Sequence, residues 1–320
     1  MDSLLSRFAE DSYWLARYIE RAHDLARILD VTKSFGDAHD AGANWGSVLD
    51  LFDDRAAFKK KYKSISARDV IRFYVLDKTN PNSIISCVGA AHNNARTLRH
   101  LISVDMWVLI NIFYNDLLAL RTRDVTENRL SAVCQMIKDR SELTQGCATN
   151  TLYRDQVWQF HQLGLLVESC DQITRLVDIK TKPMLAGKRS VAEGIELSQW
   201  NLLLRAAAAY HGYLRAYPHD ISGKEVTRFI LFDPKFTGSL TLCLAEIKTA
   251  VDELQHAVGE KKTNPVKRQI RRLEKLNKAF PADGGADELH IFLDNVQLEL
   301  VNLHKVLSAQ FFPELELNAA

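Results

Sequence analysis

The sequence predicts an all-α protein, and three observations lead to that fold class. Apolar residues recur at helical spacings of three and four over long segments, two parts of the chain resemble each other at a nearly constant offset, and no run reads convincingly as a strand. The nearest strand candidate, residues 70–76 (Val-Ile-Arg-Phe-Tyr-Val-Leu), is short and lies in a helical context. We therefore expect a helix there as well.

A long N-terminal helix is expected over residues 4–31, where one apolar face repeats with the period of an α-helix. The residues of that face are Leu15, Ile19, Ala22, Ala26 and Leu29. A second long helix is expected around residues 163–177, where the same spacing returns. Its face consists of Leu163, Val167, Cys170, Thr174 and Val177.

These two helices match in residue identity as well as in period, which indicates an internal duplication. Shifted by 148 positions, Leu15, Glu20, Arg27 and Asp30 fall on Leu163, Glu168, Arg175 and Asp178. At a shift of 156, Ser83 and Cys87 fall on Ser239 and Cys243. We expect the two copies to face each other about a pseudo-two-fold axis and to share one core.

The chain is expected to divide into a first helical repeat at 1–150, a second at 151–258 and a C-terminal helical pair at 259–320 that packs on the repeats as one compact unit. Ser83 and Ser239 stand where helix N-caps belong. Loops are expected at 36–44, 182–194 and 217–224, and a break at residues 281–285 (Pro-Ala-Asp-Gly-Gly) separates the last two helices.

Composition narrows the classes of function. Forty-one Lys plus Arg balance forty Asp plus Glu, so no overall field attracts nucleic acid or an anionic membrane. Acidic residues interrupt the N-terminal apolar stretch, so we expect neither a signal peptide nor a membrane span, and a cytoplasmic protein. The five scattered cysteines, with no Cys-x-x-Cys pair, are expected to be reduced and mostly buried.

The polar face of the first helix carries alternating charges at three- and four-residue spacings. These residues are Arg17, Glu20, Arg21, Asp24, Arg27 and Asp30. One interpretation is a solvated, ion-paired face. The other follows from the duplication: two such faces meeting at the pseudo-two-fold would form a central charged cleft whose arginine forks hold a carboxylate or phosphate.

Several motifs together resemble the bacterial Alpha-E family, also called domain of unknown function 403. They are Tyr-Trp-Leu-Ala-Arg-Tyr-Ile-Glu-Arg-Ala at 13–22, Asn-Pro-Asn-Ser-Ile-Ile-Ser-Cys at 80–87, Asn-Ala-Arg-Thr-Leu-Arg at 94–99, Met106-Trp107 and Asn111. The resemblance covers nearly the whole chain, including 158–179 and 289–311. It implies a helical fold with a Glu-Arg motif, matched at Glu20-Arg21. The second copy departs from it with Glu168-Ser169.

The resemblance implies two partners, a circularly permuted ATP-grasp ligase and a transglutaminase-like peptidase, in a system that forms or processes peptide or amide bonds. Our first hypothesis is an accessory, substrate-holding component of that system. The second is an enzyme of the same pathway, with Glu20 as general base and Arg17, Arg21 or Arg96 holding an anionic intermediate. The ligand contacts expected are Arg17, Arg21, Arg27, Asp30, Asn94, Arg96, Arg99, Glu168 and Arg175.

A third hypothesis is a metal-binding helical bundle, because Glu20-x-x-His23 and Glu253-x-x-His256 both have the ligand spacing of carboxylate-bridged di-iron sites. The two pairs are not related by the duplication, so we expect no metal, and we expect no cofactor. Because Glu168 lacks an adjacent arginine, replacing it is expected to harm function less than replacing Glu20.

Residues 261–278 are expected to form an amphipathic helix with one strongly basic face. Its basic residues are Lys261, Lys262, Lys267, Arg268, Arg271, Arg272, Lys275 and Lys278. A solvated face is the plain interpretation, and docking of an acidic partner protein is the functional one. Nucleic-acid binding is not expected, since the total charge is balanced and no aromatics are interleaved.

Overall fold

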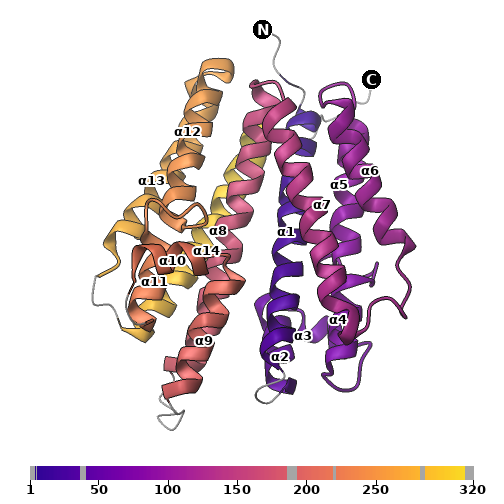
Figure 1. The fold of residues 1–320 in the computed structure, drawn as a ribbon. Coiled ribbons are helices and arrows are strands. Elements are labelled where there is room, and N and C mark those ends of the chain that lie inside the picture. Colours follow the sequence, from indigo (N-terminus) through magenta and orange to yellow (C-terminus); the bar gives the residue numbers. More distant parts are fainter. Residues whose placement is uncertain are drawn as a thin grey trace.

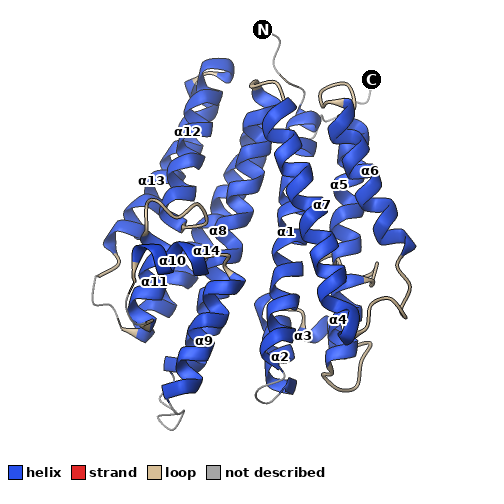
Figure 2. Cartoon of the chain, in the orientation of Figure 1, coloured by secondary structure: helices blue, strands red, loops and turns tan. Residues whose placement is uncertain are grey.

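The computed structural model describes residues 4, 6–36, 41–185, 193–218, 221–281 and 285–313. These residues form α-helices and one short 3-10 helix, and no strand occurs among them (Figure 2). In the first half the α-helices are α1 (Ser6–Gly36), α2 (Ala41–Leu51), α3 (Arg55–Lys59), α4 (Ala67–Val75), α5 (Ile84–Thr97), α6 (Val104–Ala119) and α7 (Leu130–Thr151), and the 3-10 helix is η1 (Glu127–Arg129). The second half contains α8 (Gln156–Leu185), α9 (Glu193–Ala206), α10 (Tyr210–Ala216), α11 (Gly223–Phe232), α12 (Leu240–Val258), α13 (Glu260–Ala279) and α14 (Ala286–Phe311).

Two long helices, α1 and α8, form the centre of the molecule and run side by side in the same direction (Figure 1). Helices α5 and α7 pack on α1, and α6 packs on both of them. On the other side α12 and α14 pack on α8, and α13 packs on both of them. The short helices α2–α4 and α9–α11 gather toward one end of the bundle (Figure 1). Every other helix is thus layered around the α1–α8 pair.

The apolar faces predicted for the two central helices are the faces that the structure buries. Leu15, Ile19 and Leu29 of α1 are inaccessible to solvent or nearly so. On α8, Leu163, Cys170 and Val177 are likewise buried. Burial of a large aliphatic side chain contributes about 1.5–3 kcal/mol, so these faces define where the two helices meet their neighbours. The prediction of both helices is confirmed.

Serine N-caps begin five of the helices. Ser66, Ser83, Ser103, Ser222 and Ser239 precede α4, α5, α6, α11 and α12, and each side-chain oxygen accepts a hydrogen bond from the backbone N–H three residues on. Each such bond satisfies one backbone donor that the first turn leaves unpaired. The caps expected at Ser83 and Ser239 are therefore confirmed.

The structure also confirms the expected helix at the strand-like run and the free state of the cysteines, and it corrects one loop boundary. Residues 70–75 are helical within α4, as predicted, and all five cysteines are free, four of them buried. The loop expected at 36–44 is wrong at its end, because α2 already begins at Ala41; residues 37–40 lie outside the described part. Among the described residues, no helix is both long and apolar enough to cross a membrane.

Candidate functional site at the junction of the central helices

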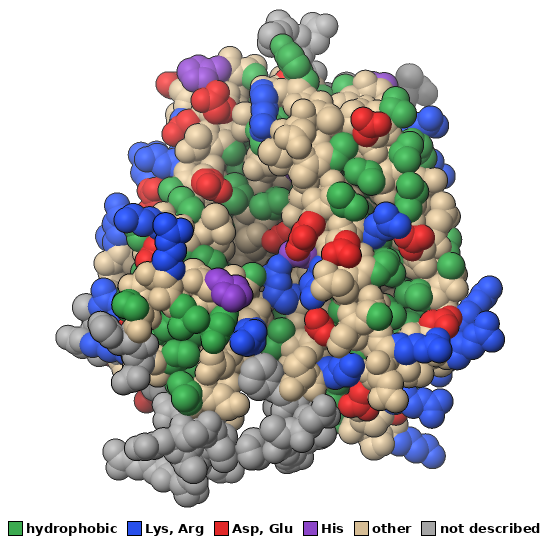
Figure 3. Space-filling model, viewed as in Figure 1, with side chains coloured by type: hydrophobic (Ala, Val, Ile, Leu, Met, Phe, Trp, Pro, Cys, Tyr) green, Lys and Arg blue, Asp and Glu red, His purple; other side chains and the backbone are tan. Residues whose placement is uncertain are grey.

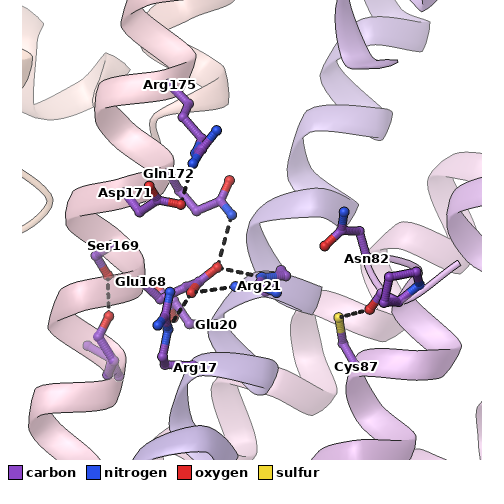
Figure 4. A network of polar contacts seen from close by, with 12 residues as sticks. Arg17, Glu20, Arg21, Asn82, Cys87, Glu168, Ser169, Asp171, Gln172 and Arg175 are labelled. Carbon is purple, nitrogen blue, oxygen red and sulfur yellow. Dashed lines mark hydrogen bonds and ion pairs between the residues drawn. The ribbon is translucent and has the colours of Figure 1, made fainter. Parts of the chain in front are cut away.

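A buried carboxylate lies between two arginines where α1 meets α8. Glu168 of α8 is fully buried. Its two oxygens accept hydrogen bonds from Arg21 Nε (2.6 Å) and Nη2 (2.9 Å), and Oε2 also accepts one from Arg17 Nε (2.8 Å). Figure 4 shows both guanidinium groups reaching from α1 toward this side chain. The arginine forks expected to bind a ligand thus hold the protein's own carboxylate.

Electrostatics fix this triad in its charged form. Burial alone would raise the pKa of Glu168, but Arg21 and Arg17 outweigh it and hold that pKa well below its usual range. Gln172 Nε2 donates a further hydrogen bond to Glu168 Oε1 (3.0 Å). Tyr13 Oη accepts one from Arg17 Nη1 (3.2 Å). Because Glu168 and both arginines have hydrogen-bond partners within the protein, we interpret the triad as a buried ion-paired contact that joins α1 to α8.

The neighbouring carboxylate, Glu20, is in a different environment. It is partly buried, and its oxygens accept hydrogen bonds from Ser169 Oγ (3.0 Å) and from Gln145 Nε2. Burial, with the Asp24 carboxylate as the next contribution, raises the pKa of Glu20 to about 8. Glu20 also lines a cavity of about 70 Å³, large enough for a few water-sized groups. Of the two acids Glu20 and Glu168, only Glu20 lines this cavity.

Asp24 and Arg27 of α1 continue the cavity wall. Arg27 Nη1 donates to Asp24 Oδ1 (3.0 Å), and Arg27 Nη2 lies 3.2 Å from the ring nitrogens of His23. Burial raises the pKa of Asp24, and burial together with Arg27 lowers the pKa of His23. The remaining cavity residues are Ile28, Ser169, Gln172, Ile173, Leu176, Ala206, Ala207 and Gly238. Most of that wall is apolar.

The comparisons with known proteins bear on this geometry. Residues 4–312 match the Alpha-E family, which is described as "a predicted alpha-helical domain with a conserved ER motif". The chain belongs to the Alpha-E family. Glu20-Arg21 is the one Glu-Arg pair in its sequence. In this Alpha-E chain the two side chains of that pair serve different partners: Arg21 binds Glu168, and Glu20 meets Ser169 and Gln145.

Two curated relatives are longer proteins. "Uncharacterized protein Mb2597" of Mycobacterium bovis and "Uncharacterized protein MT2643" of Mycobacterium tuberculosis are each 23% identical to this chain over 343 aligned positions, which cover 95% of this chain. The alignment covers 36% of each relative, so the chain spans about a third of the length of the curated relatives it matches. No solved structure matches it.

The other sequence-predicted ligand contacts are spread along the Alpha-E bundle. Asp30 is paired with Lys138 of α7 (3.0 Å), and Arg175 with Asp171 (2.9 Å). Arg96 is exposed on α5, and Arg99 is exposed in the turn that follows it, where its guanidinium lies over the Trp107 ring. Together with Asn94 they lie outside the set of residues that line the cavity. Of the nine ligand contacts expected, the cavity brings Arg27 alone together with Glu20. A ligand role for all nine stays a prediction.

At the first Glu-x-x-His pair, the positively charged side chain of Arg27 occupies contacts that a metal ion would need. Ligand atoms of Glu20, His23 and Asp24 lie within 4.8 Å of one another, but the Arg27 guanidinium already faces His23 and Asp24. The second pair, Glu253 and His256, is exposed on α12. We expect no stoichiometric iron, manganese or zinc in freshly purified protein. Elemental analysis that found one ion per chain, lost on His23→Ala, would reverse this prediction.

The basic helix predicted at 261–278 is present as α13. Val266, Ile270 and Leu273 are buried against the bundle, while Arg268 and Arg271 are exposed. This confirms the amphipathic pattern. Whether an acidic partner protein docks there stays a prediction.

Sequence reasoning missed Gln172, Ser169 and the turn after α9. In the sequence Ser169 stands out only as the residue that replaces an arginine after Glu168, and nothing indicates that its hydroxyl donates to Glu20. Gln172 is uncharged and belongs to no motif. In the turn, Ala208 adopts a φ of 54°, and the backbone N–H groups of Ala208 and Ala209 donate to the carbonyls of Arg205 (3.1 Å) and Leu204 (2.7 Å). This is a Schellman turn that places alanine where glycine is favoured, directly beside the cavity residue Ala207.

Ala208→Gly is therefore expected to stabilise the protein by about 0.5–1 kcal/mol, because it removes the steric cost of a left-handed conformation. Urea unfolding measures the change. Ala245→Gly on the exposed face of α12 is the control, and it should destabilise by about 1 kcal/mol. If both substitutions lower the free energy of unfolding by the same amount, the left-handed conformation of Ala208 has no steric cost.

Proposed function

We propose that this chain is an accessory, substrate-holding component of a cytoplasmic bacterial system in which an ATP-grasp ligase and a transglutaminase-like peptidase form or process peptide or amide bonds. The observation that carries the proposal is the cavity at Glu20, which lies against α1 and α8 and combines a mostly apolar wall with a few polar groups. Sites of that kind orient one end of a small ligand.

The proposal takes the chain as a duplicated helical unit. The starts of α4, α5, α6 and α7 (67, 84, 104 and 130) and those of α11, α12, α13 and α14 (223, 240, 260 and 286) differ by 156 in every case. A constant offset through four helices favours duplication over chance. In this view α13 and α14 are the counterparts of α6 and α7, so the second repeat extends through the C-terminal pair that the sequence alone placed outside it.

Matching hydrogen bonds support the same view. Ser83 Oγ donates to the carbonyl of Asp77 (2.7 Å), and Ser239 Oγ donates to the carbonyl of Asp233 (2.6 Å). The two donors are 156 positions apart, and so are the two acceptors. Turn geometry has thus been kept along with helix positions.

The central contacts pair crosswise, as they do when two copies meet about a two-fold axis. Arg21 of α1 contacts Glu168 of α8, and Ser169, the counterpart of Arg21, contacts Glu20, the counterpart of Glu168. Serine at 169 makes the two contacts unequal. Glu168 is ion-paired with Arg17 and Arg21. Glu20 accepts hydrogen bonds from neutral groups and lines the cavity. A duplicated scaffold with one such substitution yields a single asymmetric site.

The need for a partner is supported by the relatives. Nearly two thirds of each mycobacterial relative lies outside the region that matches this chain, so there the helical unit is one part of a larger polypeptide. An ATP-grasp ligase and a transglutaminase-like peptidase are the partners that the family resemblance implies, and the exposed basic face of α13 offers a surface for an acidic one.

An enzyme of the same pathway is the second candidate. It is favoured by Glu20, whose pKa of about 8 suits a general base near neutral pH and which faces the cavity. Against it, Arg17 and Arg21, which were expected to hold an anionic intermediate, both donate to Glu168. The holding role needs no such intermediate, so we place it first.

Affinity purification from the native host tests the proposal. We expect an ATP-grasp ligase to co-purify in stoichiometric amount, and the pair, but not this chain alone, to form an amide product with consumption of ATP. Turnover by the chain alone would instead establish the enzyme. A purified chain with neither a ligase partner nor turnover would reject both.

Glu20→Gln in that purified pair is expected to lower product formation by about tenfold or more, the effect of losing one charge-assisted hydrogen bond, while the melting temperature changes by only a few degrees. Glu253→Gln is the matched control, since Glu253 has the same Glu-x-x-His context but is exposed on α12. An equal loss of product formation in both variants would show that Glu20 is not part of the site.

A further inference from the structure

We infer that the cavity at Glu20 binds the primary amino end of an aliphatic ligand. This inference rests on the proposed function and names the chemical class of the substrate that the chain holds. It is carried by an unmet hydrogen-bond acceptor, by the excess of acceptors over donors in the cavity, and by the apolar wall beside them.

The unmet acceptor is the side-chain oxygen of Gln172. This residue is 5% exposed and lines the cavity, and its Oε1 accepts no hydrogen bond from the described residues. The amide cannot simply be turned over, because its Nε2 donates to Glu168, an ionised carboxylate that only accepts. Figure 4 shows the amide nitrogen toward Glu168 and the oxygen turned away. A buried acceptor without a donor costs about 1–3 kcal/mol, which a ligand N–H in the adjoining cavity would recover.

Two of the side chains that line the cavity with hydrogen-bond donors, Ser169 and Arg27, already have partners. Ser169 Oγ is within hydrogen-bond distance of Glu20 and of the Leu165 carbonyl, and the Arg27 guanidinium donates to Asp24 and faces His23. The acceptors are in excess: two carboxylates and the Gln172 amide oxygen. A primary ammonium offers three N–H donors and no acceptor, so it complements this set. A carboxylate or phosphate would add acceptors where acceptors already dominate.

The net charge of the side chains in the cavity also favours an ammonium group. With Glu20 and Asp24 ionised and Arg27 positive, the three side chains carry one net negative charge, which one ammonium neutralises. Burial and Asp24 raise the pKa of Glu20 to about 8, so this carboxyl is largely protonated at neutral pH until a cation favours its ionised form. Glu168 offers the ligand no free acceptor, because Arg17 and Arg21 hold its two oxygens. This triad carries one net positive charge and does not line the cavity, so the ammonium meets Glu20 and Asp24.

The wall and the opening define the rest of the ligand. Ile28, Ile173 and Leu176 line the cavity and suit a short run of methylene groups. Arg27 also lines a larger cleft of about 740 Å³, whose wall includes Asp30, Lys138, Glu142, Arg205, Tyr210 and His211. Figure 3 shows a hollow with acidic and basic side chains close by, where the two halves of the molecule meet. The amino end therefore enters the small cavity while the body of the ligand lies in the cleft.

The test is a titration of the isotope-labelled chain with n-butylamine, followed by NMR at the side-chain amide of Gln172 and the backbone amide of Ser169. We expect saturable shifts in the millimolar range, the affinity open to a ligand of so few atoms. Equimolar n-butanol and butyrate are the matched probes, and we expect neither to saturate. Shifts of equal size with butanol or butyrate would overturn the inference, as would no saturable shift with the amine.

Two variants tie binding to the cavity. Glu20→Gln removes the charge and should weaken n-butylamine by about tenfold or more, and Ala207→Leu should block entry while leaving every polar group in place. Glu253→Gln should bind as the wild type does. Unchanged amine binding in Ala207→Leu would place the amine elsewhere and overturn the inference. Because this assay needs no partner, amine binding without a ligase partner rejects the proposed function alone, and a ligase partner without amine binding rejects the inference alone.

Discussion

Glu168→Gln is expected to destabilise the protein by about 3–5 kcal/mol, the usual cost of leaving a buried charge without its partner. Arg17 and Arg21 both direct their guanidinium groups at this carboxylate, at 2.8 and 2.6 Å, and both are largely shielded from solvent. Glutamine keeps the shape but leaves two cations with one neutral acceptor. Denaturant unfolding of wild type and variant gives the difference.

Two controls separate this effect from an ordinary ion pair. Asp116→Asn breaks a half-exposed pair with Arg140 (2.8 Å) and should cost less than about 1 kcal/mol. Removing all three charges, with Arg17→Met and Arg21→Met added to Glu168→Met, should recover much of the loss, because no buried charge is then unpaired. If the triple variant is as unstable as Glu168→Gln, packing rather than charge governs the site.

The same carboxylate sets the acid limit of stability. The folded-state pKa of Glu168 is depressed below its ordinary value of 4.5, so its contribution is fully present above about pH 4.5 and is lost as the pH falls below that value. The stability difference between wild type and Glu168→Gln should therefore shrink below pH 4.5 and stay constant between pH 5 and 7. A difference that is the same at pH 3.5 and pH 7 would contradict this assignment.

The helical architecture could be predicted because it depends on local patterns. The spacing of Leu15, Ile19 and Leu29 identifies the buried face of α1 without knowledge of what covers it. Serine before an apolar run identifies the starts of α5 and α12. The start of α2 was missed, because residues 41–44 (Ala-Gly-Ala-Asn) carry neither a cap nor a periodic pattern, and tertiary packing decides such a segment.

The site could be predicted only in part, because its pairs join residues about 150 positions apart. Adjacent residues on a helix point about 100° apart, and the two residues of the Glu-Arg motif have different partners: Arg21 binds Glu168, and Glu20 accepts from Ser169. The sequence ranked Glu168 as the less important acid because serine follows it. The structure shows that Glu168 is the acid the arginines of α1 hold. The available signal was the match between residues 148 positions apart, since the duplication that we propose from it predicts crosswise rather than local pairing.

Gly164→Ala is expected to cost about 3 kcal/mol, although alanine is the better helix former by about 1 kcal/mol. Gly164 lies inside α8 against the backbone of Tyr13 in α1. An added Cβ would overlap the Tyr13 carbonyl oxygen and would lie 2.9 Å from its carbonyl carbon. A backbone atom cannot rotate away as a side chain can, so the two central helices must move apart. Thermal and urea unfolding would measure the loss.

Gly146 supplies the matched control, because it too lies inside a long helix, α7, but an added Cβ would meet nothing within 4 Å. Gly146→Ala should stabilise the protein by about 1 kcal/mol, so the two substitutions are expected to have opposite signs. The consequence reaches the site, since Gly164 and Tyr13 each lie one turn before Glu168 and Arg17. A separation of α1 from α8 at this point would lengthen the Arg17–Glu168 hydrogen bond. Adding Glu168→Gln to Gly164→Ala should then cost less than the two separate losses together, and full additivity would show that the helix contact and the ion-paired triad are independent.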